Sequence, residues 1–287
     1  MGQETALALA ARGYRVFGSV LTPGERADLE AQCARRGLQL EIVAMDVTQE
    51  PGVRESVDRI VSTCGRIDAL VCFAGLGLRG FFEDLRIEEI RRVYDVNVFG
   101  LMAVTKAVLP HMRKARSGRI ILTSSIGGRM GSMTISGYAS SKFAVEGFAE
   151  CLYQEVYPFG IRVSLLEPGL VATPHFTVNR NRSADAVNPA SPYYPWFCQH
   201  EQMVDRILAR ASFGPQEVAQ TVCGILSARN PRLRYVVGRN AKLIFALRRY
   251  IPGEIFQRIY WAAVRKMVTR PRIQAQGLSG ASESHTA

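Results

Sequence analysis

The sequence lacks the residue patterns of a metal site or a disulfide framework. Its 287 residues include only four histidines, which are scattered. Its six cysteines form no C-x-x-C pair and have no regular spacing. We therefore expect no bound metal, and reduced, mostly buried thiols typical of a cytosolic compartment. The thiols are Cys33, Cys64, Cys72, Cys151, Cys198 and Cys223.

Long apolar runs are also missing. No stretch approaches the roughly 20 consecutive apolar residues that a membrane-spanning helix needs. The N-terminus does not have the basic-then-apolar order of a secretory signal. We therefore expect a cytoplasmic protein.

Acidic residues are scarce in one part of the chain only. The net charge is +11, yet residues 1–228 are nearly neutral, with 24 basic and 23 acidic residues. Residues 229–272 contain 12 basic residues against the single acid Glu254. A localised excess argues against a general nucleic-acid binder and leaves a membrane-surface or acidic-partner patch open.

The remaining pattern alternates strands and helices. A hydrophobic content of 47% supplies ample core. The alternation predicts a single α/β domain over residues 1–272, with a doubly wound, Rossmann-like parallel sheet, followed by a polar, disordered tail over 273–287. Strands are expected at 14–20, 40–45, 69–73, 120–122, 161–166 and 234–237, and helices at 5–12, 23–36, 49–64, 136–155, 216–229, 241–250 and 254–268.

Polar and glycine residues collect where these strands end. In a parallel α/β sheet the ligand lies at the C-terminal edge of the strands, so these positions are expected to meet there. They are Asp46-Val47, Ala74-Gly75, Ser124-Ser125 and Pro168-Gly169.

Three side chains carry the predicted chemistry. Tyr138 and Lys142 are four residues apart and share one helix face, where the ammonium is expected to lower the pKa of the phenol. Ser125, thirteen residues upstream of Tyr138, is placed to hold a carbonyl or alcohol oxygen while the tyrosine exchanges its proton. The hydride is then left to a cofactor.

The set Ser125, Tyr138 and Lys142 resembles the active site of the short-chain dehydrogenase/reductase family. The stretch from Ser125 to Glu150 is most similar to its hydroxysteroid and retinol dehydrogenase branch. The resemblance implies that Asn97 completes a catalytic tetrad by holding a water near the lysine, and that Lys142 also binds ribose. It further implies a cofactor site made of Gly2, Asp46, Val47, Ala74, Gly75, Asn97, Tyr138, Lys142, Pro168, Gly169, Val171 and Thr173.

The chain departs from the family pattern in two places. Cys72-Phe73 replace two asparagines of the family motif. At the N-terminus, the first strand and most of the glycine-rich turn are missing, and Gly2 matches only its last glycine. We hypothesise a start codon assigned too late, and we expect a sheet without its central strand, whose two neighbours lose a hydrogen-bonded partner.

The cofactor prediction depends on the end of the strand over residues 14–20. An acidic side chain there would favour NAD, but the sequence continues Ser19-Val20-Leu21-Thr22. Arg26 is a candidate partner for the extra phosphate of NADP. NADP is therefore preferred over NAD.

Two segments leave alternatives open. Residues 174–213 are expected to form a substrate lid, whose aromatics contact an apolar substrate or pack the lid on the body; they are Tyr193, Tyr194, Trp196 and Phe197. The C-terminal helices over 241–268 are amphipathic and basic, and fit packing on the domain, on a second subunit or on an anionic membrane. On the second helix one apolar face is expected from Ile255, Phe256, Ile259, Tyr260, Ala263, Val264 and Met267.

The sequence thus predicts an NAD(P)-dependent oxidoreductase that transfers a hydride between nicotinamide and a secondary alcohol or ketone. The substrate is expected to be a small apolar molecule, steroid-, retinoid- or lipid-like. The resemblance to the family implies that the protein is a homo-oligomer. One alternative is a catalytically impaired protein of the same fold that senses a cofactor or acts as a scaffold. Another is a membrane-surface binding module built on the basic C-terminus.

Overall fold

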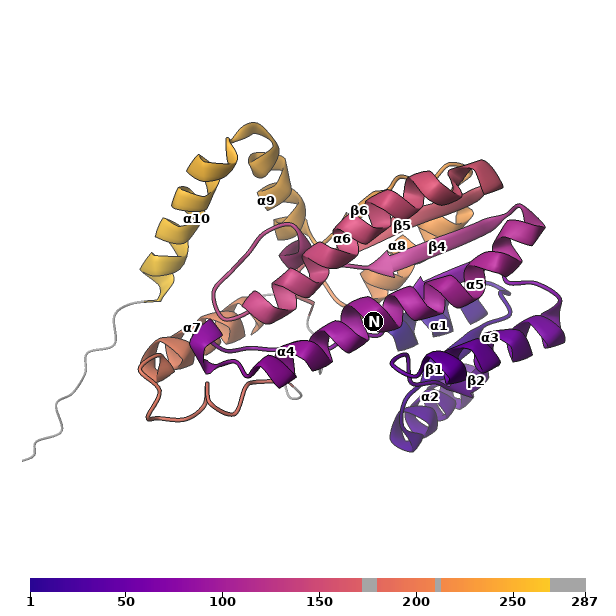
Figure 1. Ribbon diagram of the computed structural model, residues 1–287, viewed down its shortest axis with the longest axis horizontal. Helices are drawn as coiled ribbons and strands as arrows, with labels where there is room; N and C mark the ends of the chain where they lie inside the picture. The colour runs from indigo at the N-terminus through magenta and orange to yellow at the C-terminus, as the bar shows by residue number, and fades with distance from the viewer. Residues whose placement is uncertain (172–179, 210–212, 269–287) are drawn as a thin grey trace, which may run out of the picture.

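The computed structural model describes residues 1–171, 180–209 and 213–268, and its strands form two parallel sheets (Figure 1). The smaller sheet pairs β1 (Phe17–Val20) with β2 (Glu41–Ala44). The larger sheet has the order β3-β4-β5-β6. Its strands are β3 (Ala69–Cys72), β4 (Gly118–Thr123), β5 (Ile161–Pro168) and β6 (Arg234–Val237).

The two sheets are separated between β1 and β3. β1 is paired only with β2, and β3 is paired only with β4, so each has one unpaired edge among the described residues. The predicted parallel α/β fold is confirmed, and the expected loss of a shared partner appears as a break between β1 and β3.

Helices cover both faces of the larger sheet. On one face lie α3 (Glu50–Cys64), α5 (Leu101–Ala115) and α6 (Ser136–Val156), which pack on Ile120 and Leu122. On the other face α8 (Pro215–Ser227) packs on Ile121, and α1 (Gly2–Ala10) lies against α8. Figure 1 shows α5 and α6 in front of the sheet and α1 and α8 behind it. Successive side chains of β4 point to opposite faces of the sheet. Because both faces are buried, the strand has a continuous apolar run.

Local signals set the ends of the early helices. The helix α2 (Pro23–Arg36) begins with a capping box, in which the Thr22 hydroxyl accepts from the Glu25 amide at 3.2 Å. It ends at Gly37, whose φ of 62° is accessible to glycine at little cost. Strand β1 begins at Phe17, later than the predicted residue 14, because its ladder with β2 starts at the pair Phe17 and Glu41.

A long helical span crosses the molecule before β4. It consists of α4 (Ile87–Tyr94), the π-helical turn η2 (Asp95–Gly100) and α5. By length and composition alone, Ile87–Ala115 could cross a membrane. Because α5 packs on β3, β4 and α3, the span reads as a core helix of the α/β fold.

Beyond β5 the structure holds a helix that the sequence analysis missed, α7 (Tyr194–Ala209), within the predicted lid. The chain then forms α9 (Arg239–Tyr250) and α10 (Gly253–Met267), a bent pair that extends beyond the end of the sheet (Figure 1). The predicted tail over 273–287 lies outside the described residues.

Candidate active site

Strand β4 delivers two serines to the C-terminal edge of the larger sheet. Ser125 follows the strand and caps the short helix η3 (Ile126–Gly128), its Oγ accepting a hydrogen bond from the Gly127 amide at 3.1 Å. Its side chain is buried. This bond holds the hydroxyl at the turn between the strand and α6.

Helix α6 places Tyr138 and Lys142 beside that turn, as predicted. The Lys142 ammonium is buried and donates to the Thr123 carbonyl at 2.9 Å. Its Nζ lies 5.9 Å from the centroid of the Tyr138 ring. The helix thus brings phenol and ammonium onto one face, at the end of β4.

The pKa of Tyr138 differs from the expectation. Burial of the phenol raises its pKa, while hydrogen bonding to Ser125 acts in the opposite direction. The predicted lowering by Lys142 is therefore absent in the protein alone, because Nζ is directed to the Thr123 carbonyl. Burial also lowers the pKa of Lys142 to about 8, against a smaller upward effect from Cys72.

Asn97 lies fully buried in the π-helical turn η2. Its Oδ1 accepts from the Leu76 amide at 2.6 Å, and its Nδ2 donates to the Leu76 carbonyl at 2.9 Å and to the Ser141 hydroxyl at 3.0 Å. The wider turn of a π-helix is often found at functional sites. Here it fixes Asn97 between the loop after β3 and helix α6.

Gly75 lies between Asn97 and Lys142. A Cβ added to it would stand 3.3 Å from Asn97 Oδ1 and 3.5 Å from Lys142 Nζ. A side chain at this position would therefore crowd both groups. The structure thus brings together the predicted residues Gly75, Asn97, Tyr138, Lys142 and Ser125 at one edge of the sheet.

The other predicted cofactor residues flank this group. A Cβ added to Gly2, at the start of α1, would lie 3.3 Å from Phe73, so the N-terminus of α1 adjoins Ala74-Gly75. Val47 packs on Gly100, next to the turn that carries Asn97. The surface carboxylate of Asp46 accepts from the Thr48 amide and hydroxyl.

The turn after β5 is held by β6. The Gly169 amide donates to the Val237 carbonyl at 2.9 Å, directly after Pro168. Val171 is fully buried. Thr173, predicted to contact the nicotinamide carboxamide, lies outside the described residues. The N-terminus of α1 and the buried ammonium of Lys142 both lie beside Gly75, which has no side chain. This arrangement fits a dinucleotide cofactor with its phosphate groups.

The end of β1 is arranged differently from the expectation. Arg26 donates to the Ile42 carbonyl at 2.9 Å and pairs with Glu30 at 3.3 Å, so its guanidinium is already engaged. The carboxylate of Glu25 folds back to accept from the Leu21 and Thr22 amides at 2.7 and 3.2 Å. An acid thus lies near the end of β1, although it is engaged by the helix cap.

The model of the family described as short chain dehydrogenase matches residues 1–184. The chain belongs to this family. As a short-chain dehydrogenase it is an NAD(P)-dependent oxidoreductase that acts on CH–OH groups.

Relatives of this short-chain dehydrogenase cover most of its length. It is 36% identical over 265 residues to 3-ketodihydrosphingosine reductase from Bacteroides thetaiotaomicron, covering 91% of this chain and 94% of that protein. It is 36% identical over 197 residues to human 17-beta-hydroxysteroid dehydrogenase type 1, covering 68% and 60%. The crystal structure of a short-chain dehydrogenase from Streptomyces avermitilis superposes with a TM-score of 0.72 at 27% identity, covering 91% and 94%.

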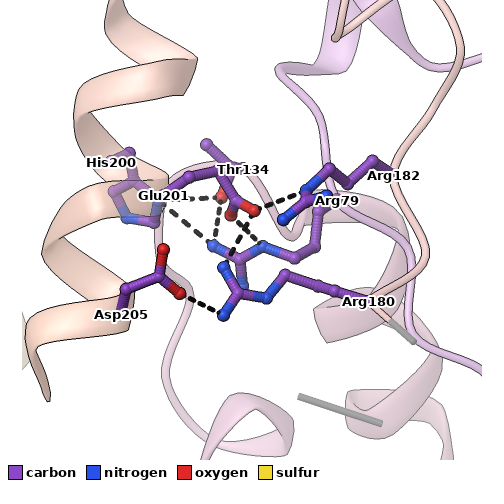
Figure 2. A network of polar contacts seen from close by, with 7 residues as sticks. All are labelled: Arg79, Thr134, Arg180, Arg182, His200, Glu201 and Asp205. Carbon is purple, nitrogen blue, oxygen red and sulfur yellow. Dashed lines mark hydrogen bonds and ion pairs between the residues drawn. The ribbon is translucent and has the colours of Figure 1, made fainter. Parts of the chain in front are cut away.

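A buried ionic network, missed by the sequence analysis, ties the predicted lid of this short-chain dehydrogenase to its site (Figure 2). The Glu201 carboxylate, on α7, accepts from Arg79 at 2.5 Å, Arg180 at 2.9 Å and Arg182 at 2.7 Å. Burial alone would raise the pKa of Glu201, but the arginines outweigh it and the pKa is lowered. Arg180 also pairs with Asp205 at 2.5 Å.

The same network reaches the loop between Ser125 and Tyr138. Thr134 in this loop has a φ of 63°, strained for a β-branched residue. Its hydroxyl lies 3.1 Å from His200 Nδ1 and accepts from Arg79 at 3.3 Å. Burial, and then Arg79, lower the pKa of His200 to about 4, so the imidazole is neutral at pH 7. The network therefore fixes the loop that leads into α6.

The aromatics of the predicted lid are used mainly in packing. Phe197 is buried, and Trp196 packs with the cluster between α7 and α10. Tyr193 stacks on Phe81 with ring centroids 4.9 Å apart. These contacts favour the alternative in which the aromatics attach the lid to the body.

A second buried charge cluster lies behind Ser124. Burial raises the pKa of Glu146, on α6, and that of Glu167, on β5. Arg234 contacts both carboxylates, at 3.1 and 3.3 Å, and Arg129 donates to Glu167 at 3.1 Å. The charged residues of this cluster lie on separate strands and helices, so no sequence pattern indicated it. The cluster lies beneath the active site and supports it.

The pKa of Lys142 predicts a pH dependence. The ammonium is charged below about pH 8 and neutral above it, so kcat/KM for the cofactor should fall about tenfold per pH unit above 8, since kcat/KM reports the free enzyme. Lys142→Met should abolish this pH-dependent step in kcat/KM. Lys114→Met, on the exposed end of α5, should keep it. The same step in both variants would exclude Lys142 as its source.

Proposed function

We propose that the protein transfers a hydride between NADP and the oxygen-bearing carbon of a lipid-like secondary alcohol or ketone, with a long-chain 3-keto sphingoid base as the substrate class. The observation that carries this proposal is the set Ser125, Tyr138, Lys142 and Asn97 at one sheet edge. The substrate class is supported by the near full-length similarity to 3-ketodihydrosphingosine reductase. Steroid and retinoid substrates are the competing classes.

In this proposal Ser125 positions the substrate oxygen, and Tyr138 supplies or removes the proton at that oxygen through its phenolic hydroxyl. Lys142 binds ribose, and its ammonium stabilises the ionised phenol once it turns from the Thr123 carbonyl toward Tyr138. Asn97 supports the relay that returns the proton. When ketone is reduced, one hydride is added to carbon and one proton to oxygen, so the balance is complete. The nicotinamide group, when bound, donates or accepts the hydride.

The cofactor would be held by Gly2, Gly75, Asn97 and Lys142, which fit it by position and charge. We infer a preference for NADP because Glu25, the first acid after β1 in the sequence, is engaged by two backbone amides. A carboxylate held in this way is less available to the ribose hydroxyls that NAD presents. Arg26, engaged by Ile42 and Glu30, supports this preference less than its position in the sequence suggested.

The test is a turnover assay with matched carbonyl substrates. The purified chain is given NADPH or NADH together with 3-ketodihydrosphingosine, a 17-ketosteroid or retinal, and nicotinamide absorbance is followed. We expect NADPH with the sphingoid ketone to give a kcat/KM at least about tenfold above the other pairs, corresponding to roughly 1.4 kcal/mol of discrimination. A higher value with the steroid or retinal would reassign the substrate class while keeping the enzyme class.

The predicted homo-oligomer also remains a proposal. Phe99 on η2 and Phe143 on α6 are 60% and 46% exposed, so both helices present apolar side chains to a partner. The proposed location is the cytoplasm, and it remains a prediction.

A further inference from the structure

The α9–α10 hairpin has apolar residues on two opposite sides. Towards the body, Phe245, Phe256 and Val264 are buried. Away from it, α9 exposes Leu243, Leu247 and Tyr250, which are 61%, 51% and 81% exposed. These three have the spacing i, i+4, i+7, so they share one face of the helix. A surface helix of a globular protein normally places polar residues there.

Helix α10 has the predicted apolar face, but the domain covers only part of it. Phe256 and Val264 are buried and Tyr260 is half-buried, but Ile255 and Ile259 are 51% and 56% exposed. The apolar residues span too wide an arc for one contact, so packing on the domain covers only part of them. Exposed apolar surface is therefore left on both helices of the hairpin.

Basic residues surround this exposed surface. Residues 239–267 contain seven basic residues and the single acid Glu254. The seven are Arg239, Lys242, Arg248, Arg249, Arg258, Arg265 and Lys266. In the part of the chain that the structure describes, none of them forms an ion pair. Arg248 is half-buried over the ring of Phe256, but the other six are exposed, so their charge is available to a partner.

We propose that the α9–α10 hairpin binds the surface of an anionic lipid bilayer. Apolar side chains beside lysine and arginine, with an aromatic at the helix end, suit the boundary between acyl chains and headgroups. Basic residues close to such a surface are attracted to anionic lipids. This inference does not depend on the proposed function, although a lipid-like substrate would be reached from the same surface.

A second copy of the chain is a poorer occupant for this surface. In a two-fold dimer through the hairpin, the same patch would face itself, so two strongly basic surfaces would be brought together. An anionic bilayer instead supplies the missing negative charge. Trp261, exposed at 50%, also lines a groove of about 570 Å³ between α10 and α6. The exposed apolar surface thus continues beyond the hairpin.

The test is co-sedimentation of the full chain with vesicles. We expect binding to phosphatidylcholine vesicles that contain phosphatidylserine, no binding to phosphatidylcholine alone, and release by salt. The double variant L243S/L247S should weaken binding at least about tenfold, since each leucine loses buried apolar area. Charge reversal at Arg249 and Arg258 should weaken it by about fivefold or more for each position.

Matched controls distinguish binding through this surface from nonspecific binding to vesicles. Phe82→Ser removes an apolar residue that is 66% exposed elsewhere, and Arg54→Glu reverses an exposed charge on α3. Both should bind as the unchanged protein does. Failure of the unchanged protein to bind, or equal binding to neutral vesicles, would overturn the proposal. A mass increase in solution that L243S/L247S abolishes would instead assign the surface to a second copy.

Discussion

Replacing Tyr138 by phenylalanine should lower kcat by roughly 10²- to 10⁴-fold, the usual contribution of a general acid or base. The substitution removes one hydroxyl and keeps the ring on α6. Ser125, whose hydroxyl accepts from the Gly127 amide, cannot replace it as a proton donor of suitable acidity. Turnover should therefore fall while the fold is retained.

Cofactor affinity should change little in Tyr138→Phe. The groups placed to hold the cofactor are Gly2, Gly75, Asn97 and Lys142, and the Lys142 ammonium is fixed by the Thr123 carbonyl rather than by the phenol. The dissociation constant of NADPH, measured by nicotinamide fluorescence, should remain within about twofold of that of the unchanged protein, a difference of less than 1 kcal/mol.

Tyr157→Phe is the matched control, because Tyr157 directly follows α6 and its side chain is 48% exposed. It should leave both turnover and cofactor binding unchanged. Equal turnover in Tyr138→Phe and in the unchanged protein would remove Tyr138 from the mechanism. Cofactor binding without any turnover in the unchanged protein would support the scaffold or sensing alternative.

Local patterns predicted most of the fold. The helix α2 and the strand β6 have their predicted limits, because a capping box, a glycine end and a short apolar run act over a few residues. The grouping of Gly75 with Ser125 could also be predicted, because the C-terminal ends of parallel strands share one edge. Asn97 lies on a helical turn, and its place beside them was implied only by the family resemblance. The break between β1 and β3 was expected from the departure of the N-terminal sequence from the family pattern.

Interactions between distant residues could not be predicted. Arg79 and Glu201 are 122 positions apart, and nothing in either neighbourhood indicates the partner. The helix α7 was missed because its buried face includes the polar residues His200 and Glu201, which interrupt the apolar period. The pKa of Tyr138 depends on burial and on the direction of the Lys142 ammonium, which the four-residue spacing does not specify. The two apolar sides of α9 were not predicted either, because the sequence does not indicate which apolar residues the domain covers.

Replacing Glu201 by alanine should lower the free energy of unfolding by roughly 3–5 kcal/mol, the usual effect of leaving a buried charge without its partner. The cost falls mainly on Arg79, whose side chain is 9% exposed and whose other side-chain partners, Thr134 and His200, are neutral. Arg182 is 40% exposed and remains hydrated, and Arg180 keeps Asp205. Urea unfolding followed by circular dichroism measures the change.

Asp185→Ala is the matched control for Glu201→Ala. It also removes a carboxylate near the predicted lid, but the Arg86–Asp185 pair is largely exposed, so stability should hardly change. Adding Arg79→Met to Glu201→Ala should recover part of the lost stability, because the unpaired charge is then removed as well. If the double variant is as unstable as the sum of the two single ones, the unpaired arginine is not the cause.

Because Thr134 belongs to the same network, Glu201→Ala should also lower kcat, with the affinity for NADPH unchanged. This is expected when the loop between Ser125 and Tyr138 loses its support.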